Sequence, residues 1–111
     1  MMKHEILQYR NAEGVLIIGN WLDSLADKDA AARITARFAR LAEGNFGDCK
    51  PIGGAIYELR FNFGPGYRVY YTKIGKQIVL LLCGGDKHRQ STDIDRARDY
   101  LFDYIKRSKT K

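Results

Sequence analysis

Two runs of alternating residues, joined by a short turn, constrain the fold of this chain most strongly. Residues 56–63 and 67–72 each alternate apolar with mostly polar side chains, and Gly64-Pro65-Gly66 separates them. Successive side chains of a strand point to opposite faces of a sheet, and a proline followed by a glycine suits a tight turn. The pattern predicts an antiparallel hairpin. One face would carry Tyr57, Leu59, Phe61, Phe63, Tyr67, Val69 and Tyr71, and the other Glu58, Arg60, Asn62, Arg68, Tyr70 and Thr72.

Two further segments are predicted to be strands. Residues 78–82 form the continuous apolar run Ile-Val-Leu-Leu-Leu, which is typical of a central strand covered on both faces. Residues 3–9 form a short first strand. Residues 45–54 contain three glycines and a proline and predict a loop that carries Lys50.

Three helices are predicted from apolar residues at helical spacing, which form one buried stripe in each. The first follows Asn11 as a capping residue, and the second runs from the N-cap Asp27 to Gly44. Its Arg33, Arg37 and Arg40 are expected to form a solvated stripe. The loop 84–90 has no apolar residue, and Ser91 or Thr92 then offers an N-cap for a last helix.

The resulting order, β-α-α-β-β-β-α, predicts an α+β fold in which a helical hairpin packs on one face of an antiparallel sheet. At 111 residues the chain is expected to form a single domain over residues 1–107, with a frayed tail at 108–111.

Charge is distributed unevenly along the chain. The net charge of +6 divides into six bases against seven acids in residues 1–48, and 13 bases against six acids in residues 49–111. A localised excess of positive charge is what a polyanion-binding surface requires. Cys49 and Cys83 form no CxxC pattern, so free thiols in a reducing compartment are expected. No apolar run of membrane-spanning length and no signal-peptide core is present, which predicts a cytoplasmic protein with no membrane association.

The polar face of the hairpin and the following loop hold the candidate site. Arg60, Arg68 and Tyr70 would lie on the face, and Asp86, Lys87, His88 and Arg89 in the loop. Arginines and aromatic rings of this kind bind single-stranded RNA. No metal-ligand cluster is visible and no cofactor is expected, so RNA cleavage here would be metal-free.

Such cleavage needs a base for the 2′-hydroxyl proton, cations for the charge on phosphorus and an acid for the leaving oxygen. Arg68 and Lys87 suit the cationic task. His88 is the best acid or base, with Asp86, Glu58 or Tyr70 behind it. The alternatives are a solvated His88 without a catalytic role and a surface ion pair between Arg60 and Glu58.

Several short motifs resemble the addiction-module killer proteins, a HigB-like branch of the RelE/ParE toxin superfamily. The resemblance covers essentially the whole chain. The motifs are Gly47-Asp48-Cys49-Lys50-Pro51-Ile52-Gly53, Ile56-Tyr57-Glu58-Leu59-Arg60, Phe63-Gly64-Pro65-Gly66-Tyr67-Arg68-Val69-Tyr70-Tyr71 and Leu82-Cys83-Gly84-Gly85-Asp86-Lys87.

The resemblance implies the toxin of a type II toxin–antitoxin module, with an adjacently encoded, DNA-binding antitoxin as partner. RelE and HigB relatives cleave mRNA on the ribosome, which implies mRNA and the ribosome as further partners. Arg68 matches the arginine that contacts the scissile phosphate, and Lys87, Arg89 and Lys50 match basic positions around it. The stretch 90–95 lacks the tyrosine that RelE carries there, and of the HigB histidines and carboxylate only His88 and Asp86 have counterparts. The shared fold leaves a second function open, a ParE-like toxin that poisons DNA gyrase without being an enzyme.

Overall fold

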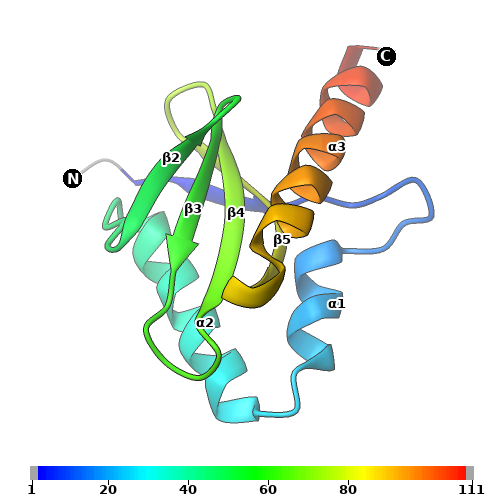
Figure 1. Ribbon diagram of the computed structural model, residues 1–111. Coiled ribbons are helices and arrows are strands. Elements are labelled where there is room, and N and C mark those ends of the chain that lie inside the picture. Colours follow the sequence, from blue (N-terminus) through cyan, green and yellow to red (C-terminus); the bar gives the residue numbers. More distant parts are fainter. Residues whose placement is uncertain (1–2, 110–111) are drawn as a thin grey trace.

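The computed structural model describes residues 3–109, which form an α+β fold, as predicted (Figure 1). The elements in chain order are β1 (Glu5–Gln8), α1 (Ile17–Ser24), α2 (Lys28–Ala42), β2 (Cys49–Gly53), β3 (Ile56–Arg60), β4 (Tyr67–Ile74), β5 (Ile78–Asp86), the 3-10 turn η1 (Lys87–Arg89) and α3 (Gln90–Lys109). Within this described part, no helix is both long and apolar enough to cross a membrane.

The five strands form one mixed sheet in the order β1-β5-β4-β3-β2. The hairpin of β3 and β4 is antiparallel with Arg60 and Arg68 on one face, as predicted, and its register places the two residues opposite each other. The prediction of a wholly antiparallel sheet is wrong, because β1 pairs with β5 in parallel. The α1–α2 hairpin separates β1 from the other strands in the sequence. The apolar run of β5 does not indicate whether β1 pairs with it in parallel or antiparallel.

The segment predicted to be a loop at residues 45–54 contains a strand instead. Residues 49–53 form β2, which pairs with β3 at the edge of the sheet. The register shifts between Pro51 and Gly53, which marks an irregularity in the pairing. An edge position tolerates proline because the missing N–H can face away from the neighbouring strand. A segment with the composition of a loop can therefore form an edge strand.

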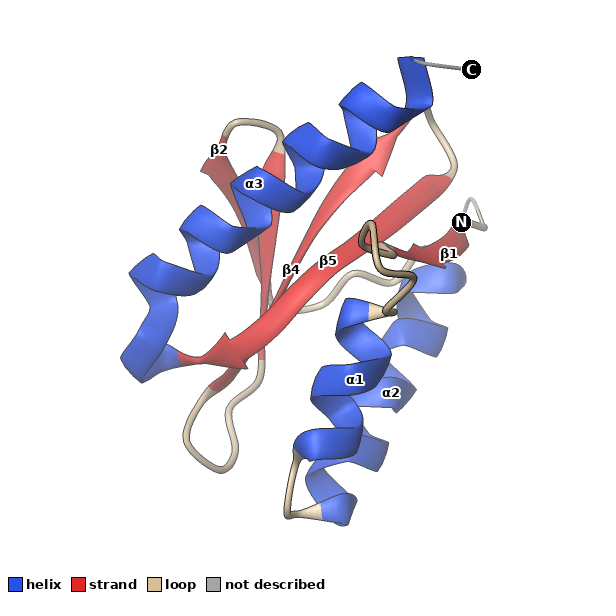
Figure 2. Ribbon diagram, turned by 90° about the vertical axis from the view of Figure 1, so that its right-hand side faces the viewer, coloured by secondary structure: helices blue, strands red, loops and turns tan. Residues whose placement is uncertain are grey.

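Helices cover both faces of the sheet (Figure 2). The α1–α2 hairpin packs on one face over a core that includes Ile18, Ile34 and Tyr71, which confirms the predicted hairpin layer. The other face is covered by α3, whose Ala97 lies in a second core with Leu80 and Leu82. The polar face of the β3–β4 hairpin is therefore not the open surface that the alternation suggested.

Of the two predicted N-caps in the first half of the chain, Asp27 caps its helix and Asn11 does not. Asp27 caps α2 as predicted, with its side chain accepting hydrogen bonds from the backbone N–H groups of Asp29 and Ala30. The Asn11 side chain accepts from the backbone of Glu13 and Val15, so it stabilises a turn, and α1 begins later, at Ile17.

No loop separates β5 from the last helix. The predicted loop 84–90 is wrong because β5 continues through Asp86, whose carboxylate accepts from the backbone N–H of His88 and caps η1. The helix α3 follows at Gln90, so Ser91 and Thr92 lie within its first turn and do not cap it. At the other end α3 includes Ser108 and Lys109, part of the segment predicted to fray, and residues 110–111 lie outside the described residues.

Candidate functional site

Arg68 and Lys87 line one small cavity beside the β3–β4 turn, where β4 begins and β5 ends. We call it the Arg68–Lys87 cleft. It measures about 260 Å³ and is lined by Phe61, Asn62, Phe63, Gly64, Gly66, Arg68 and Lys87. The backbone N–H of Lys87 donates to the carbonyl of Gly66 at 3.0 Å, which ties η1 to the β3–β4 turn. Gly66 has φ +80°, and a β-carbon there would press on the Lys87 stem at 3.1 Å, so a glycine lets the lysine approach.

The Arg68 side chain is held in place within this cleft. Its Nη1 donates to the carbonyl oxygens of Gly66 and Tyr67, each at 3.0 Å, and only 14% of the side chain is exposed. Its Nε lies 3.9 Å from Oε1 of Glu58. A guanidinium fixed in this way needs little reorganisation when it meets an anion, which is the property that electrostatic catalysis uses.

Glu58 lies beneath Arg68 and is completely buried. Its Oε2 accepts hydrogen bonds from the Tyr70 hydroxyl at 3.3 Å and from the Gln90 side chain, both of them inside the α3-covered face. Burial, followed by the nearby Glu58 charge, raises the pKa of the Tyr70 hydroxyl above its usual range. The prediction that Tyr70 binds RNA is wrong, because no part of its side chain reaches the surface. Tyr70 and Glu58 are both buried, so neither side chain lies at the surface where it could assist His88 in proton transfer.

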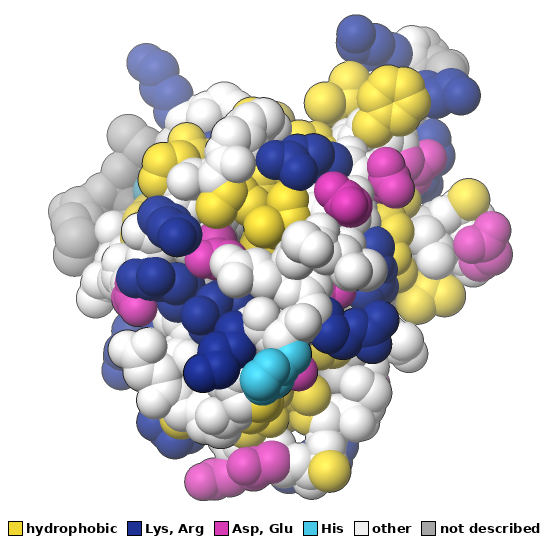
Figure 3. Space-filling view, viewed as in Figure 1, with side chains coloured by type: hydrophobic (Ala, Val, Ile, Leu, Met, Phe, Trp, Pro, Cys, Tyr) yellow, Lys and Arg dark blue, Asp and Glu magenta, His cyan; other side chains and the backbone are white. Residues whose placement is uncertain are grey.

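The remaining predicted catalytic residues do not all converge on the cleft. The His88 side chain is exposed, while the Asp86 carboxylate is engaged in capping η1. Asp86 and Arg89 line a different cavity of about 180 Å³, together with Asp93 and Arg96. Lys50 lies exposed on β2, opposite Glu58 in register. Figure 3 shows Lys and Arg side chains on both sides of a histidine on this face of the molecule.

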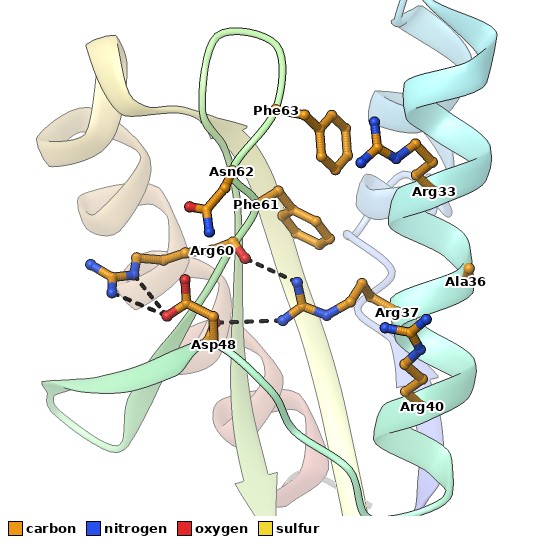
Figure 4. A pocket seen from close by; sticks show the side chains of 9 residues that line it. All are labelled: Arg33, Ala36, Arg37, Arg40, Asp48, Arg60, Phe61, Asn62 and Phe63. Carbon is orange, nitrogen blue, oxygen red and sulfur yellow. Dashed lines mark hydrogen bonds and ion pairs between the residues drawn. The ribbon is translucent and has the colours of Figure 1, made fainter.

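Arg60 belongs to a second cavity next to the cleft. It pairs with Asp48 at 3.0 Å, whereas the sequence suggested Glu58 as its partner. The surrounding space, which we call the arginine cavity, measures about 340 Å³ (Figure 4). It is lined by Arg33, Ala36, Arg37, Arg40, Asp48, Arg60, Phe61, Asn62 and Phe63.

The expected solvated stripe on α2 is therefore wrong in part. Arg37 is half-buried and donates to the carbonyl of Arg60 at 3.0 Å, with longer bonds to the carbonyls of Phe46 and Asp48. The helical spacing of Arg33, Arg37 and Arg40 in the sequence indicates that the three side chains share one face of α2. Their meeting with Arg60 depends on how α2 packs against β3, and no local pattern could show it.

The described residues 3–109 contain no group of three His, Cys, Asp or Glu side chains placed to hold a metal ion. Cys49 and Cys83 are both free thiols.

Comparison with known proteins identifies the family. Residues 20–100 match the family described as phage derived protein Gp49-like (DUF891), which covers more than half of the chain. An uncharacterized protein of Haemophilus influenzae strain Rd is 47% identical over 83 residues, which span 75% of this chain and 84% of that protein. The chain belongs to the Gp49-like family, a RelE-like toxin family of addiction modules.

Proposed function

We propose that this protein is the toxin of a type II toxin–antitoxin module and that it inhibits translation by cleaving mRNA on the ribosome, without a metal ion. Membership in a toxin family supports the first part. One observation supports the second: Arg68 is held by two backbone carbonyls and shares a cleft with Lys87. Two cations at one concave site suit the non-bridging oxygens of a single phosphate.

The proposed reaction is attack of the RNA 2′-oxygen on the adjacent phosphorus. The 2′-hydroxyl proton passes to the His88 imidazole, and the bond from phosphorus to the 5′-oxygen breaks. The leaving oxygen takes a proton from solvent, giving a 2′,3′-cyclic phosphate and a 5′-hydroxyl. Arg68 and Lys87 stabilise the negative charge that grows on the phosphoryl oxygens. His88 suits the base because an imidazole nitrogen can accept a proton and this side chain is exposed on η1.

The family membership implies an antitoxin partner. We propose that its toxin-binding segment is acidic and covers the cationic face, since complementary charge favours association with a surface rich in arginine and lysine. Messenger RNA and the ribosome are the other proposed partners.

The test compares induced expression of the wild-type chain with two variants, Arg68→Ala and Arg68→Lys, while the 5′ ends of cellular mRNA are mapped. We expect new ends with the wild-type chain and none with Arg68→Ala. Arg68→Lys keeps the charge but loses the forked geometry, and is expected to cleave far less. Lys76→Ala, an exposed lysine in the β4–β5 turn, is the matched control and should cleave normally.

Thermal melting of the purified variants separates lost function from lost folding. Growth arrest with intact transcripts and broken DNA would contradict the proposal and favour gyrase poisoning instead. His88→Ala tests the base on its own, and an unchanged cleavage rate would remove His88 from the mechanism.

A further inference from the structure

The arginine cavity carries more positive charge than its surroundings neutralise. Four guanidinium groups line it, from three positions on α2 and from Arg60 on β3, against one carboxylate, that of Asp48 (Figure 4). The Asp48 carboxylate is already engaged by Arg60, with both Nε and Nη2 of the arginine directed at the same oxygen. The three α2 arginines therefore face the cavity without a carboxylate partner among its lining residues.

Two of these guanidinium groups also lie against phenylalanine rings. Arg33 stacks on the Phe63 ring with its Cζ 3.8 Å from the ring centroid, and Arg37 lies over the Phe61 ring at 4.7 Å. The hydrogen-bond partners of Arg37 are all carbonyl oxygens, which orient the guanidinium but do not cancel its charge. Burial, and to a lesser degree the charge of Arg40, lowers the pKa of Arg37, against the attraction of Asp48.

A fixed cluster of like charges in a concave space is costly unless an anion binds there. Guanidinium groups offer paired N–H donors, which match the oxygens of a phosphate. Stacking on phenylalanine keeps the arginines from turning away into solvent. The cavity is thus prepared for an anion of high charge density.

The arginine cavity also adjoins the Arg68–Lys87 cleft. The two share Phe61, Asn62 and Phe63 in their walls, so they lie on either side of the same short segment. In addition, Arg60 and Arg68 are direct cross-strand partners, which places their side chains on one face. A ligand with phosphates at regular intervals could fill both spaces at once, whereas an isolated anion could fill only one.

We infer that the arginine cavity binds a backbone phosphate of the RNA strand whose scissile phosphate occupies the Arg68–Lys87 cleft. This inference rests on the proposed function, because it takes the ligand of the cleft to be RNA. It assigns Arg33 and Arg40 a binding role that is separate from the chemical step.

The experiment measures binding and cleavage separately. Binding is followed by fluorescence anisotropy with a labelled single-stranded oligonucleotide carrying 2′-O-methyl groups, which cannot be cleaved at the 2′ position, over a series of salt concentrations. The proteins are the full wild-type chain, Arg33→Gln/Arg40→Gln and the control Lys76→Gln/Lys106→Gln. All four substituted side chains are exposed, and each double variant loses two positive charges.

We expect the Arg33/Arg40 variant to bind at least about tenfold more weakly at low salt. The slope of log affinity against log salt should fall by about 0.7, the contribution of one neutralised phosphate of a single strand. The control should change much less. Equal affinities and slopes for the two double variants would overturn the inference. A second binding series uses a polyglutamate peptide in place of the oligonucleotide. If the Arg33/Arg40 variant binds RNA normally but no longer binds this peptide, the inference is also overturned, because the cavity then binds an acidic protein partner.

Cleavage by Arg68→Ala and Arg68→Lys tests the proposed function on its own. If the wild-type chain fails to cleave RNA but the Arg33/Arg40 variant still loses affinity and salt slope, the proposed chemistry is wrong and the phosphate site stands.

Discussion

Arg68 Nε and Glu58 Oε1 face each other at 3.9 Å, too far apart for a hydrogen bond, and neither atom has another hydrogen-bond partner in the described part of the chain. The contact is therefore an ion pair between a buried carboxylate and a mostly buried guanidinium. It holds a cation at the cleft, while the hydrogen bonds of Arg68 to two carbonyls set its orientation.

The first prediction concerns removal of this charge. Glu58→Gln keeps the side-chain size but removes the negative charge that faces Arg68. It also replaces one acceptor oxygen with an amide donor, although the surrounding groups of Tyr70, Gln90 and Arg68 are themselves donors. We expect a loss of about 2–3 kcal/mol in the free energy of unfolding, measured by urea denaturation. The exposed Glu13→Gln is the control and should stay within about 0.5 kcal/mol of wild type. Equal stabilities for the two variants would contradict a structural role for the ion pair.

The second prediction concerns the close approach of α3 to β5 at Gly85. A β-carbon on Gly85 would overlap the carboxylate of Asp93, a residue that is only 2% exposed. We expect Gly85→Ala to destabilise the fold by about 1–3 kcal/mol, because the helix must shift to make room. Adding Asp93→Ala removes the overlapping group and should restore part of that loss. The four stabilities form a double-mutant cycle, and additive effects would argue against direct overlap.

The third prediction is a pH dependence that arises from Asp93. Burial raises the pKa of this carboxyl above its usual 3.8, against the opposing effects of Arg96 and Arg89. The folded state then binds the Asp93 proton more tightly than the unfolded state does. This contribution to stability is present at low pH and is lost as the pH rises from about 4 through the folded-state pKa.

The measurement compares wild type with Asp93→Asn, which cannot ionise, by urea denaturation between pH 4 and pH 7. We expect the stability of the variant relative to wild type to increase with pH across this window. Asp99→Asn, at an exposed position on the same helix, is the control and should show a much flatter difference. A constant difference for Asp93→Asn would contradict the assignment.

The fourth prediction concerns the two free thiols. Burial raises the pKa of the Cys83 thiol to about 12, and its Sγ donates to the carbonyl of Asp93 at 3.4 Å. Only the thiolate reacts with alkylating agents, so Cys83 should be inert in the folded protein. Iodoacetamide at pH 8, followed by mass spectrometry, should add at most one group, at Cys49, and two after denaturation. Labelling of folded Cys49→Ser would show that Cys83 is accessible.

The sequence predicts those parts of the fold that depend on neighbouring residues. Alternation predicts the β3–β4 hairpin with Arg60 and Arg68 on one face, and Asp27 caps α2 as predicted. The parallel pairing of β1 with β5 and the edge strand β2 depend on contacts between distant segments, so local patterns could not show them. The same limit explains why the arginine cavity was missed, since it forms only when α2 meets β3.

The prediction of the candidate site differs from the structure mainly because alternation alone indicates an open polar face on the hairpin. The apolar run of β5 indicates instead that the sheet is covered on both faces. Because β4 is the neighbour of β5, the same cover extends over β4. The α3 helix provides it and buries Glu58 and Tyr70. Polar side chains on an alternating strand can therefore belong to a hydrogen-bonded interior when a later helix returns over them.

The order of the strands also governs when the cleft can exist during synthesis. The strand β5 lies between β1 and β4, yet it is the last strand to be made, and η1 and α3 follow it. Until those segments have emerged, β1 has no neighbouring strand, Glu58 is not covered by α3 and Lys87 cannot meet Gly66. Assembly that waits for such distant contacts is slow. The cationic site is therefore completed only after β5, η1 and α3 have been made, later than β1 to β4.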